Sequence, residues 1–392
     1  MTEEADALDP AEALGMRLVV VGASDIGTVR EHNEDHFLVG DLDSGETVEV
    51  TEPWRTTGDR GPLLVLCDGM GGADGGEVAS ELASRATWRE LKDTPAGASS
   101  EVLARLVRRA VRIANADVYA MGKKEPTLHG MGTTLSAAAF AGDRLVVATV
   151  GDSRAYILRA GALVQITADQ SLQSALLDAG HSPHEALLAG GAILQALGVG
   201  EDVEPSLSIT ELRRGDRLLL CSDGLHGLVG DPALALLMSE PHSCAEAVRL
   251  LVAAARAAGG TDNITAIVCQ VGGPRFAPPA NDDDLPAFRE FDTQREGDSA
   301  LTSTSYVARR LAARIGIPQP QLPQTIPVTG QHRILRSQVG IRLPATELPI
   351  PRDDEPEDSP ARQRLARRPI PWSIWIAVAI AMCALAWWLG GR

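Results

Sequence analysis

The stretch that most constrains this chain is residues 63–72, Leu-Leu-Val-Leu-Cys-Asp-Gly-Met-Gly-Gly. Its leading run of apolar residues predicts a buried strand. The glycines that follow allow a sharp turn and the close approach of another group. Asp68 then stands at the end of a rigid strand, where it would make a well-held ligand. Taken alone, the stretch fits equally well a strand-to-helix turn in which Asp68 is solvated or caps the helix.

Other acidic residues stand at similar places, next to apolar runs that predict core strands. These are Glu34, Asp35, Asp152, Asp223 and Asp262. If the strand ends converge, the carboxylates gather, and their like charges oppose folding unless cations neutralise them. Hard oxygen ligands without histidine or cysteine nearby favour Mg²⁺ or Mn²⁺ over zinc. Two such ions can activate a water for displacement at phosphorus.

Arg30 stands four residues before Glu34, where its planar guanidinium could bind a phosphate oxygen. Taken singly, each of these residues is more often a turn aspartate or a surface arginine. The recurrence of one pattern along the chain is what favours a phosphate-processing metal site.

Composition indicates a globular protein and disfavours nucleic acid as the main partner. The chain has 392 residues, of which 44% are hydrophobic, and its net charge of −16 would be repelled by a phosphate backbone. The five cysteines have no CxxC spacing, which predicts reduced core residues in a cytosolic compartment. They are Cys67, Cys221, Cys244, Cys269 and Cys383.

Periodicity predicts strands in groups, joined by hairpin-like connections and separated by pairs of helices. This order favours packed antiparallel sheets with helices outside over a doubly wound parallel sheet. Residues 168–200 break the pattern, and we expect a mobile subdomain there. The expected strands are 17–22, 63–66, 135–140, 145–150, 155–158, 163–166, 207–209, 218–221 and 264–271, and the expected helices are 75–91, 103–121, 232–239 and 244–258.

The predicted folded domain covers residues 16–272, after a flexible start at 1–15 that lacks the pattern of a signal peptide. Residues 273–368 hold 13 of the 24 prolines and several charged blocks, which predicts a disordered linker. Residues 369–392 are predicted to form a single transmembrane helix, because 370–389 are 20 residues without a charge, with tryptophans near both edges. The alternative is a buried globular helix.

The orientation of this span follows from the arginines just before it. Arg362, Arg364, Arg367 and Arg368 precede the apolar stretch, and positive residues favour the cytoplasmic side. We therefore expect a catalytic domain in the cytoplasm, tethered to the cell membrane by a single pass through the lipid bilayer.

Six motifs occur in an order that resembles the metal-dependent protein phosphatases, the 2C-type Ser/Thr phosphatases, in their bacterial form. The resemblance covers about residues 16–272. The motifs are Ser24-Asp25-x-Gly27-x-x-Arg30-x-x-Asn33-Glu34-Asp35, Asp68-Gly69-Met70-Gly71-Gly72, Gly132-Thr133-Thr134, Gly151-Asp152-Ser153-Arg154, Ser222-Asp223-Gly224 and Asp262-Asn263.

The resemblance implies an α+β fold, a four-layer α-β-β-α sandwich of two antiparallel sheets flanked by helix pairs. It also implies two Mn²⁺ or Mg²⁺ ions at one end of the sandwich. By motif position, Asp68 would bridge both ions and Gly69 would offer its carbonyl oxygen. Asp223 and Asp262 would complete the ligands of one ion.

The remaining motif residues take further roles by the same resemblance. Glu34 would hold the second ion, Asp35 would order its waters and Arg30 would grip the substrate phosphate. Asp152 matches the position that binds a third, weaker metal. Residues 168–200 match the flap that borders the site.

The chain departs from the family pattern at two positions. Animal members carry a histidine, thought to be a general acid, where this chain has Met70, as in bacterial relatives. Bacterial relatives commonly carry Thr-x-Asp-His-Ser before the flap, where this chain has Gln170 in place of the histidine. The first change leaves the general acid open, and the second leaves substrate choice open.

The function that these residues predict is hydrolysis of phosphoserine and phosphothreonine in phosphoproteins, opposing a Ser/Thr kinase near the membrane. One alternative is a non-catalytic phosphoprotein-binding scaffold on the same fold, which the intact acidic set disfavours. Another is a two-metal nuclease, which the acidic charge and the lack of a basic groove disfavour.

Overall fold

The computed structural model describes most of the N-terminal three quarters of the chain. The chain divides into a unit of residues 1–338 and a second unit of residues 339–392, and all described residues belong to the first. The described residues are 15–71, 75–188, 191–281, 284–291 and 331–333.

Two antiparallel sheets form the centre of this unit. The strands of the first sheet are β1 (Arg17–Asp25), β4 (Trp54–Thr56), β9 (Arg154–Arg159), β10 (Ala162–Gln165), β12 (Arg217–Cys221), β13 (Ile264–Gly272) and β15 (Gln331–Arg333). Their spatial order is β15-β10-β9-β12-β13-β1-β4, with every neighbouring pair antiparallel.

The second sheet is built in the same way. Its strands are β2 (Asp35–Asp41), β3 (Glu46–Val48), β5 (Pro62–Met70), β7 (Leu135–Ala141), β8 (Arg144–Val150), β11 (Ser206–Glu211) and β14 (Phe288–Glu290). The order is β14-β11-β8-β7-β5-β2-β3, and the short β6 (Gly132–Thr133) pairs with the end of β5.

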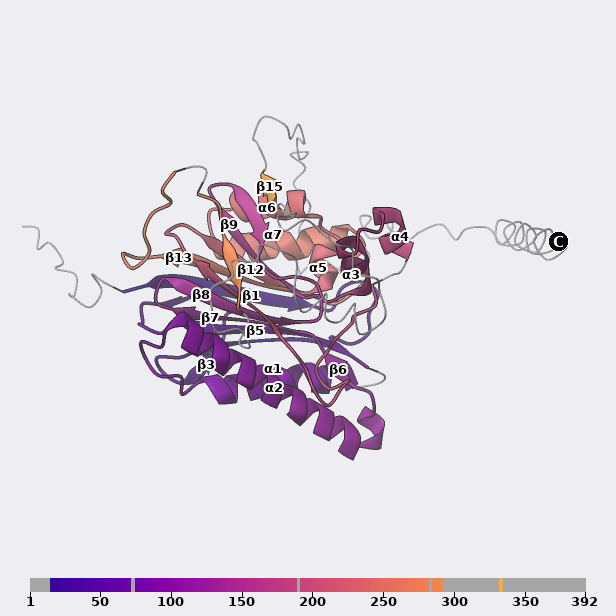
Figure 1. Cartoon of the computed structure of the whole chain (residues 1–392). Coiled ribbons are helices and arrows are strands. Elements are labelled where there is room, and N and C mark those ends of the chain that lie inside the picture. The colour runs from indigo at the N-terminus through magenta and orange to yellow at the C-terminus, as the bar shows by residue number, and fades with distance from the viewer. Residues whose placement is uncertain (1–14, 72–74, 189–190, 282–283, 292–330, 334–392) are drawn as a thin grey trace, which may run out of the picture. The chain divides into compact units, whose positions relative to one another are not determined.

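Helices cover the outer face of each sheet, as Figure 1 shows, so that the unit has four layers. The long helices α1 (Gly75–Leu91) and α2 (Ser100–Lys124) cover the second sheet, and α6 (Asp231–Ser239) and α7 (Cys244–Ala257) cover the first. The shorter elements are a 3₁₀ turn at Pro126–Leu128, α3 (Leu172–Asp178), α4 (Pro183–Leu188) and α5 (Asp223–His226).

The start of α2 follows from its local sequence. The hydroxyl oxygen of Ser99 accepts a hydrogen bond from the backbone N–H of Val102 at 3.3 Å, which satisfies one of the free donors at the helix start. Glu101 lies in the first turn, and Lys123 and Lys124 lie in the last, which complements the helix dipole.

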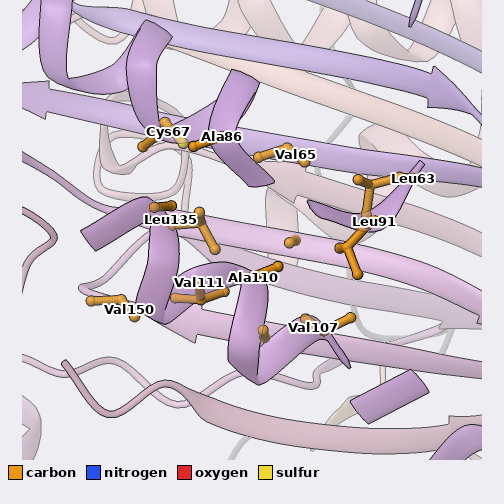
Figure 2. Packing of buried hydrophobic residues seen from close by; sticks show 14 of the residues in the cluster. Leu63, Val65, Cys67, Ala86, Leu91, Val107, Ala110, Val111, Leu135 and Val150 are labelled. Atoms are coloured by element: carbon orange, nitrogen blue, oxygen red, sulfur yellow. The ribbon is translucent and has the colours of Figure 1, made fainter. Parts of the chain in front are cut away.

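The continuous apolar run of β5 is explained by burial on both of its faces. Leu63 and Val65 pack toward α1 and α2, as Figure 2 shows, together with Val107 and Val111 of α2. Leu64, between them in sequence, belongs to the core between the two sheets. Because side chains alternate along a strand, a strand covered on both sides reads as apolar throughout.

The predicted α+β architecture of two antiparallel sheets with outer helices is confirmed. The irregular stretch expected at 168–200 contains α3 and α4, and its mobility stays a prediction. The cysteines at 67, 221, 244 and 269 are free and buried, as expected, and Cys383 lies outside the described residues.

The predicted domain boundary at residue 272 stays a prediction, but residues beyond it also pack on the domain. Phe276 is fully buried in the core between the sheets, and β14 pairs with β11. Asp284 accepts hydrogen bonds from Arg159 and Arg213. A few apolar side chains in a proline-rich stretch are enough to anchor it on a core that already exists.

The described ranges contain no helix with the length and apolar character that crossing a membrane requires. The predicted span at 370–389 and most of the predicted linker lie outside the described residues. Both therefore stay predictions.

Candidate active site

Strand pairing brings the predicted acidic residues of the second sheet to one edge. Asp35 begins β2 and lies opposite Asp68, near the end of β5, in the antiparallel register. The N-terminal end of one strand and the C-terminal end of its antiparallel neighbour share an edge. β7 begins and β8 ends at this same edge, since Leu135 pairs with Val150, and Asp152 follows β8 after a single glycine.

The first sheet delivers its acidic residues to the same end of the sandwich. β12 ends at Cys221, just before Asp223, and Cys221 pairs with Ala266 near the start of β13. Asp262 lies two residues before β13 begins. The two sheets therefore contribute carboxylates that meet across the gap between them.

Asp68 and Asp223 lie close enough for each to shift the pKa of the other. Burial raises the pKa of Asp68 well above its usual range, and the charges of Asp35 and Asp223 raise it further. Burial also raises the pKa of Asp223, with Asp262 as the next cause. Buried carboxyl groups this close to one another favour the binding of a proton or a cation.

Asp35 is buried between the sheets and is held by two hydroxyl groups of the first sheet. Its Oδ2 accepts hydrogen bonds from Ser222 Oγ at 2.8 Å and from Thr265 Oγ1 at 2.6 Å. Its Oδ1 is buried and has no hydrogen-bond partner. Burial raises the pKa of Asp35 to about 7, although both hydroxyl groups act to lower it.

Arg30 lies beside the acidic residues and binds one of them. Its Nη2 donates to Asp262 Oδ2 at 2.7 Å, and both side chains are partly exposed. This bond is the largest cause that raises the pKa of Arg30, and the charges of Glu34 and Asp68 contribute. The guanidinium therefore stands at the open side of the carboxylate cluster.

Glu34 is packed against the start of α1. A Cβ at Gly76 would collide with the Glu34 carboxylate, and burial raises the pKa of Glu34. Gly69 is equally crowded, since its N–H donates to Glu34 O at 3.1 Å and a Cβ there would meet Gly76 O. Because Gly69 and Gly76 lack side chains, the end of β5, the residues just before β2 and the start of α1 can approach one another closely at the site.

Asp152 has a buried carboxyl oxygen, Oδ1, without a hydrogen-bond partner. Burial raises its pKa to about 7, and the charges of Asp223 and Asp169 add to the effect. His226 Nε2 lies 3.1 Å from the carbonyl oxygen of Asp152, and burial lowers the pKa of His226 to about 4. The histidine therefore stays neutral beside the acidic cluster.

Polar residues that the sequence did not single out hold this arrangement. Thr134 Oγ1 accepts from the backbone N–H of Asp68 at 3.0 Å. Asn263 Oδ1 accepts from the backbone N–H of Glu34 at 2.8 Å, and its Nδ2 donates to the carbonyl oxygens of Ile26 and His32. Thr134 and Asn263 lie inside the recognised motifs, but Thr265 lies outside all of them.

The comparisons with known proteins agree with this geometry. The family model described as Protein phosphatase 2C matches residues 54–258. The chain belongs to the protein phosphatase 2C family. The family includes the serine/threonine protein phosphatase PstP of Mycobacterium tuberculosis, which is 41% identical over 251 residues, 63% of this chain and 44% of that protein. The matched part thus spans less than half of that relative.

Two further matches, a second relative and a solved structure of PstP, are covered over almost their whole length. The serine/threonine phosphatase stp of Listeria monocytogenes is 34% identical over 250 residues, 63% of this chain and 93% of that protein. A crystal structure of the catalytic domain of PstP in complex with two manganese ions has 40% identity and a TM-score of 0.53, and covers 65% of this chain and 99% of that one.

Gln170, which replaces the histidine common in bacterial 2C-type phosphatases, has a structural role. It is fully buried, and its Oε1 accepts from the backbone N–H of Gly151 at 3.0 Å and from Gln195 Nε2 at 3.0 Å. Its own Nε2 donates to the carbonyl oxygen of Thr149 at 3.2 Å. Gln170 therefore links both ends of the predicted flap, at Gln170 itself and at Gln195, to the end of β8.

The acidic cluster of this phosphatase fold fits divalent metal ions by its chemistry. It offers buried carboxylates with raised pKa values, and Asp35 and Asp152 each have a buried oxygen without a partner. Within the described ranges, however, no three or more His, Cys, Asp or Glu side chains form a group that could hold a metal ion.

Proposed function

We propose that this chain is a metal-dependent Ser/Thr phosphatase that hydrolyses phosphoserine and phosphothreonine in proteins. The observation that carries the proposal is that strand pairing brings Asp35, Asp68, Asp223 and Asp262 to one end of the sandwich, with Arg30 bound to Asp262. Membership of the protein phosphatase 2C family and the names of the relatives support the same chemistry.

The residues that would hold two Mn²⁺ or Mg²⁺ ions are those that the strand ends bring together. In this proposal Asp68 and the carbonyl oxygen of Gly69 would serve as ligands, Asp223 and Asp262 would hold one ion and Glu34 would hold the other. When bound, such ions lower the pKa of a water molecule and stabilise negative charge on phosphorus. Asp152 would hold a third, weaker ion.

Arg30 and Asp35 have separate tasks in this proposal. Arg30 is only partly buried, so its guanidinium can leave Asp262 for two oxygens of a substrate phosphate. Asp35 is locked by Ser222 and Thr265, and its partner-free Oδ1 can accept a proton from a water at the site. Met70 has no proton to give, so the leaving group takes its proton from another source.

The decisive test compares the full chain with its Asp223→Asn variant in Mn²⁺. We expect the wild type to hydrolyse an aryl phosphate and a phosphothreonine peptide, and the variant to lose about 100-fold or more in kcat/KM, with weaker Mn²⁺ binding in calorimetry. Asp59→Asn, an exposed residue paired with Arg275, is the matched control. Full wild-type activity in a strong chelator would refute the proposal.

We further propose that residues 370–389 tether the phosphatase to the cytoplasmic face of the cell membrane, where it opposes a Ser/Thr kinase. The support is the uncharged, tryptophan-flanked stretch and the arginines before it. The test deletes residues 369–392 and measures membrane fractionation and the phosphorylation of membrane proteins in cells. An unchanged distribution would contradict the tether, and unchanged phosphorylation would contradict its role.

A further inference from the structure

A short segment, residues 197–199, lies beside β6, and β6 pairs with the end of β5 that carries Asp68. The end of β5 pairs with β6, with Met70 opposite Gly132. On the other side of β6, Thr133 and Leu197 form an antiparallel bridge, with N–O distances of 3.0 and 2.9 Å between their backbones. Residues 197–199 therefore lie next to β6, one row further from Asp68.

Val199 is held firmly in this row from both sides. The backbone N–H of Gly198 donates to Asn115 Oδ1 at 2.9 Å, and Asn115 Nδ2 donates to the carbonyl oxygen of Gly200 at 3.1 Å. Asn115 is itself buried on α2. Gly198 has a φ of +85°, and a Cβ there would collide with Val118, so the chain is pressed onto the helix at this point.

Despite this anchoring, the side chain of Val199 is exposed, with 60% of its surface accessible. A Cβ at Gly132 would come within 2.9 Å of Val199 Cγ2 and 3.5 Å of Met70 Cγ, so both side chains lie over this glycine. We call Met70, Gly132 and Val199 the apolar shelf. It is an apolar surface on a hydrogen-bonded backbone, and it begins two residues after Asp68.

We propose that the apolar shelf binds an apolar side chain of the substrate polypeptide, about four residues from the phosphorylated Ser or Thr. This inference rests on the proposed phosphatase function. In this register Val199 is level with Gly71, so three residues along a strand and two rows across a sheet place Val199 about 14 Å from Asp68. An extended peptide advances about 3.3 Å per residue, so it covers that distance in about four residues.

A polypeptide substrate is the occupant that the surroundings favour. The shelf is continuous with the loop that carries Asp68, so a chain whose phosphate is at the site must pass near it. An anionic lipid surface is disfavoured by the net charge of −16. A firmly held, exposed valine also offers apolar contact at little cost in side-chain entropy.

The test uses pairs of phosphothreonine peptides that carry Leu or Asp at the fourth residue before or after the phosphothreonine and are otherwise identical. For the Mn²⁺-loaded full chain we expect the Leu peptide to have a kcat/KM about fivefold higher, on one side of the phosphothreonine. In Val199→Asp this ratio should fall to one or below, and Val199→Lys should prefer the Asp peptide. Val102→Asp, an exposed valine on the first turn of α2, should keep the wild-type ratio.

Hydrolysis of an aryl phosphate, which lacks flanking residues, separates the two hypotheses. If the wild type shows no metal-dependent aryl phosphatase activity, the proposed function itself is wrong. If that activity is present but the Leu to Asp ratio is the same in wild type, Val199→Asp and Val199→Lys, the shelf does not bind substrate. A ratio that changes equally in Val102→Asp would also refute the shelf, because the effect would then be one of overall charge.

Discussion

Thr265 of the first sheet donates a hydrogen bond of 2.6 Å to the carboxylate of Asp35 in the second. The two residues are 230 positions apart in sequence, and their bond joins the sheets at the end where the acidic residues gather. It also fixes the side chain whose other oxygen, Oδ1, has no partner. The sheets and the site are thus held by the same contact.

Removing this donor should weaken the fold and the site together. Thr265→Val keeps the shape of the side chain but leaves the buried Asp35 carboxylate with Ser222 as its remaining hydroxyl donor. We expect the free energy of unfolding to fall by about 1–3 kcal/mol. Urea unfolding measures it, with Thr47→Val on the exposed strand β3 as a control that should change little. An unchanged midpoint would mean that the bond contributes nothing to stability.

Replacing Arg30 should impair substrate binding without weakening metal binding. Arg30→Ala removes the guanidinium that we propose for the phosphate, so kcat/KM for a phosphopeptide should fall about 10- to 100-fold. Arg30→Lys keeps the charge but loses the planar guanidinium, so its kcat/KM should lie between those of the wild type and Arg30→Ala. Mn²⁺ affinity, measured by calorimetry, should not decrease, because Arg30 competes with a cation for Asp262.

Arg85→Ala is a suitable comparison for Arg30→Ala. Arg85 is exposed on α1 and pairs with Glu81 four residues before it. The kinetic constants of this variant should match those of the wild type. A loss of Mn²⁺ affinity in Arg30→Ala as large as the loss in kcat/KM would contradict the assigned role.

The stability of the chelator-treated protein should fall as pH rises from about 4 to 7. Asp35 and Asp152 have pKa values raised to about 7 by burial, whereas unfolded aspartates release their protons near pH 4. Between these values the folded state binds more protons, so the stabilisation present below pH 4 is lost as pH rises through 7. At about three pKa units each, the two groups should together contribute up to about 8 kcal/mol to this loss.

Urea unfolding across this pH range checks the sign. In Asp35→Asn the slope of stability against pH should become less negative than in the wild type, because one of the two groups no longer titrates. With Mn²⁺ present the trend should reverse, since metal binding requires ionised carboxylates. Equal slopes for wild type and Asp35→Asn in chelator would show that Asp35 does not titrate in this range.

The positions of the acidic residues were predictable from the sequence because each stands beside an apolar run, and antiparallel pairing brings such run ends together. The contacts that hold them were not. In the sequence Thr265 is an ordinary strand residue. Its contact with Asp35 becomes visible only when the positions of the two separate sheets are known. The binding of Asp262 to Arg30 likewise depends on distance in space, not on a local pattern.

Truncation tests whether the domain ends at the predicted residue 272 or continues to residue 291. A chain ending at residue 272 loses Phe276, the pairing of β14 with β11, and the bonds from Arg159 and Arg213 to Asp284. A chain ending at residue 291 keeps all of them. We expect the longer form to unfold at the urea concentration of the full chain's catalytic domain, and the shorter form to unfold much earlier or to be insoluble.

A point variant separates the loss of packing from the loss of chain length. Phe276→Ala in the form ending at 291 should cost about 3–5 kcal/mol, because it leaves a cavity in the core between the sheets. Arg275→Ala, next to it and paired with the exposed Asp59, should cost less than about 1 kcal/mol. If the form ending at 272 were as stable as the form ending at 291, residues 273–291 would contribute nothing to the stability of the domain. Phe276→Ala would then have to leave the free energy of unfolding nearly unchanged.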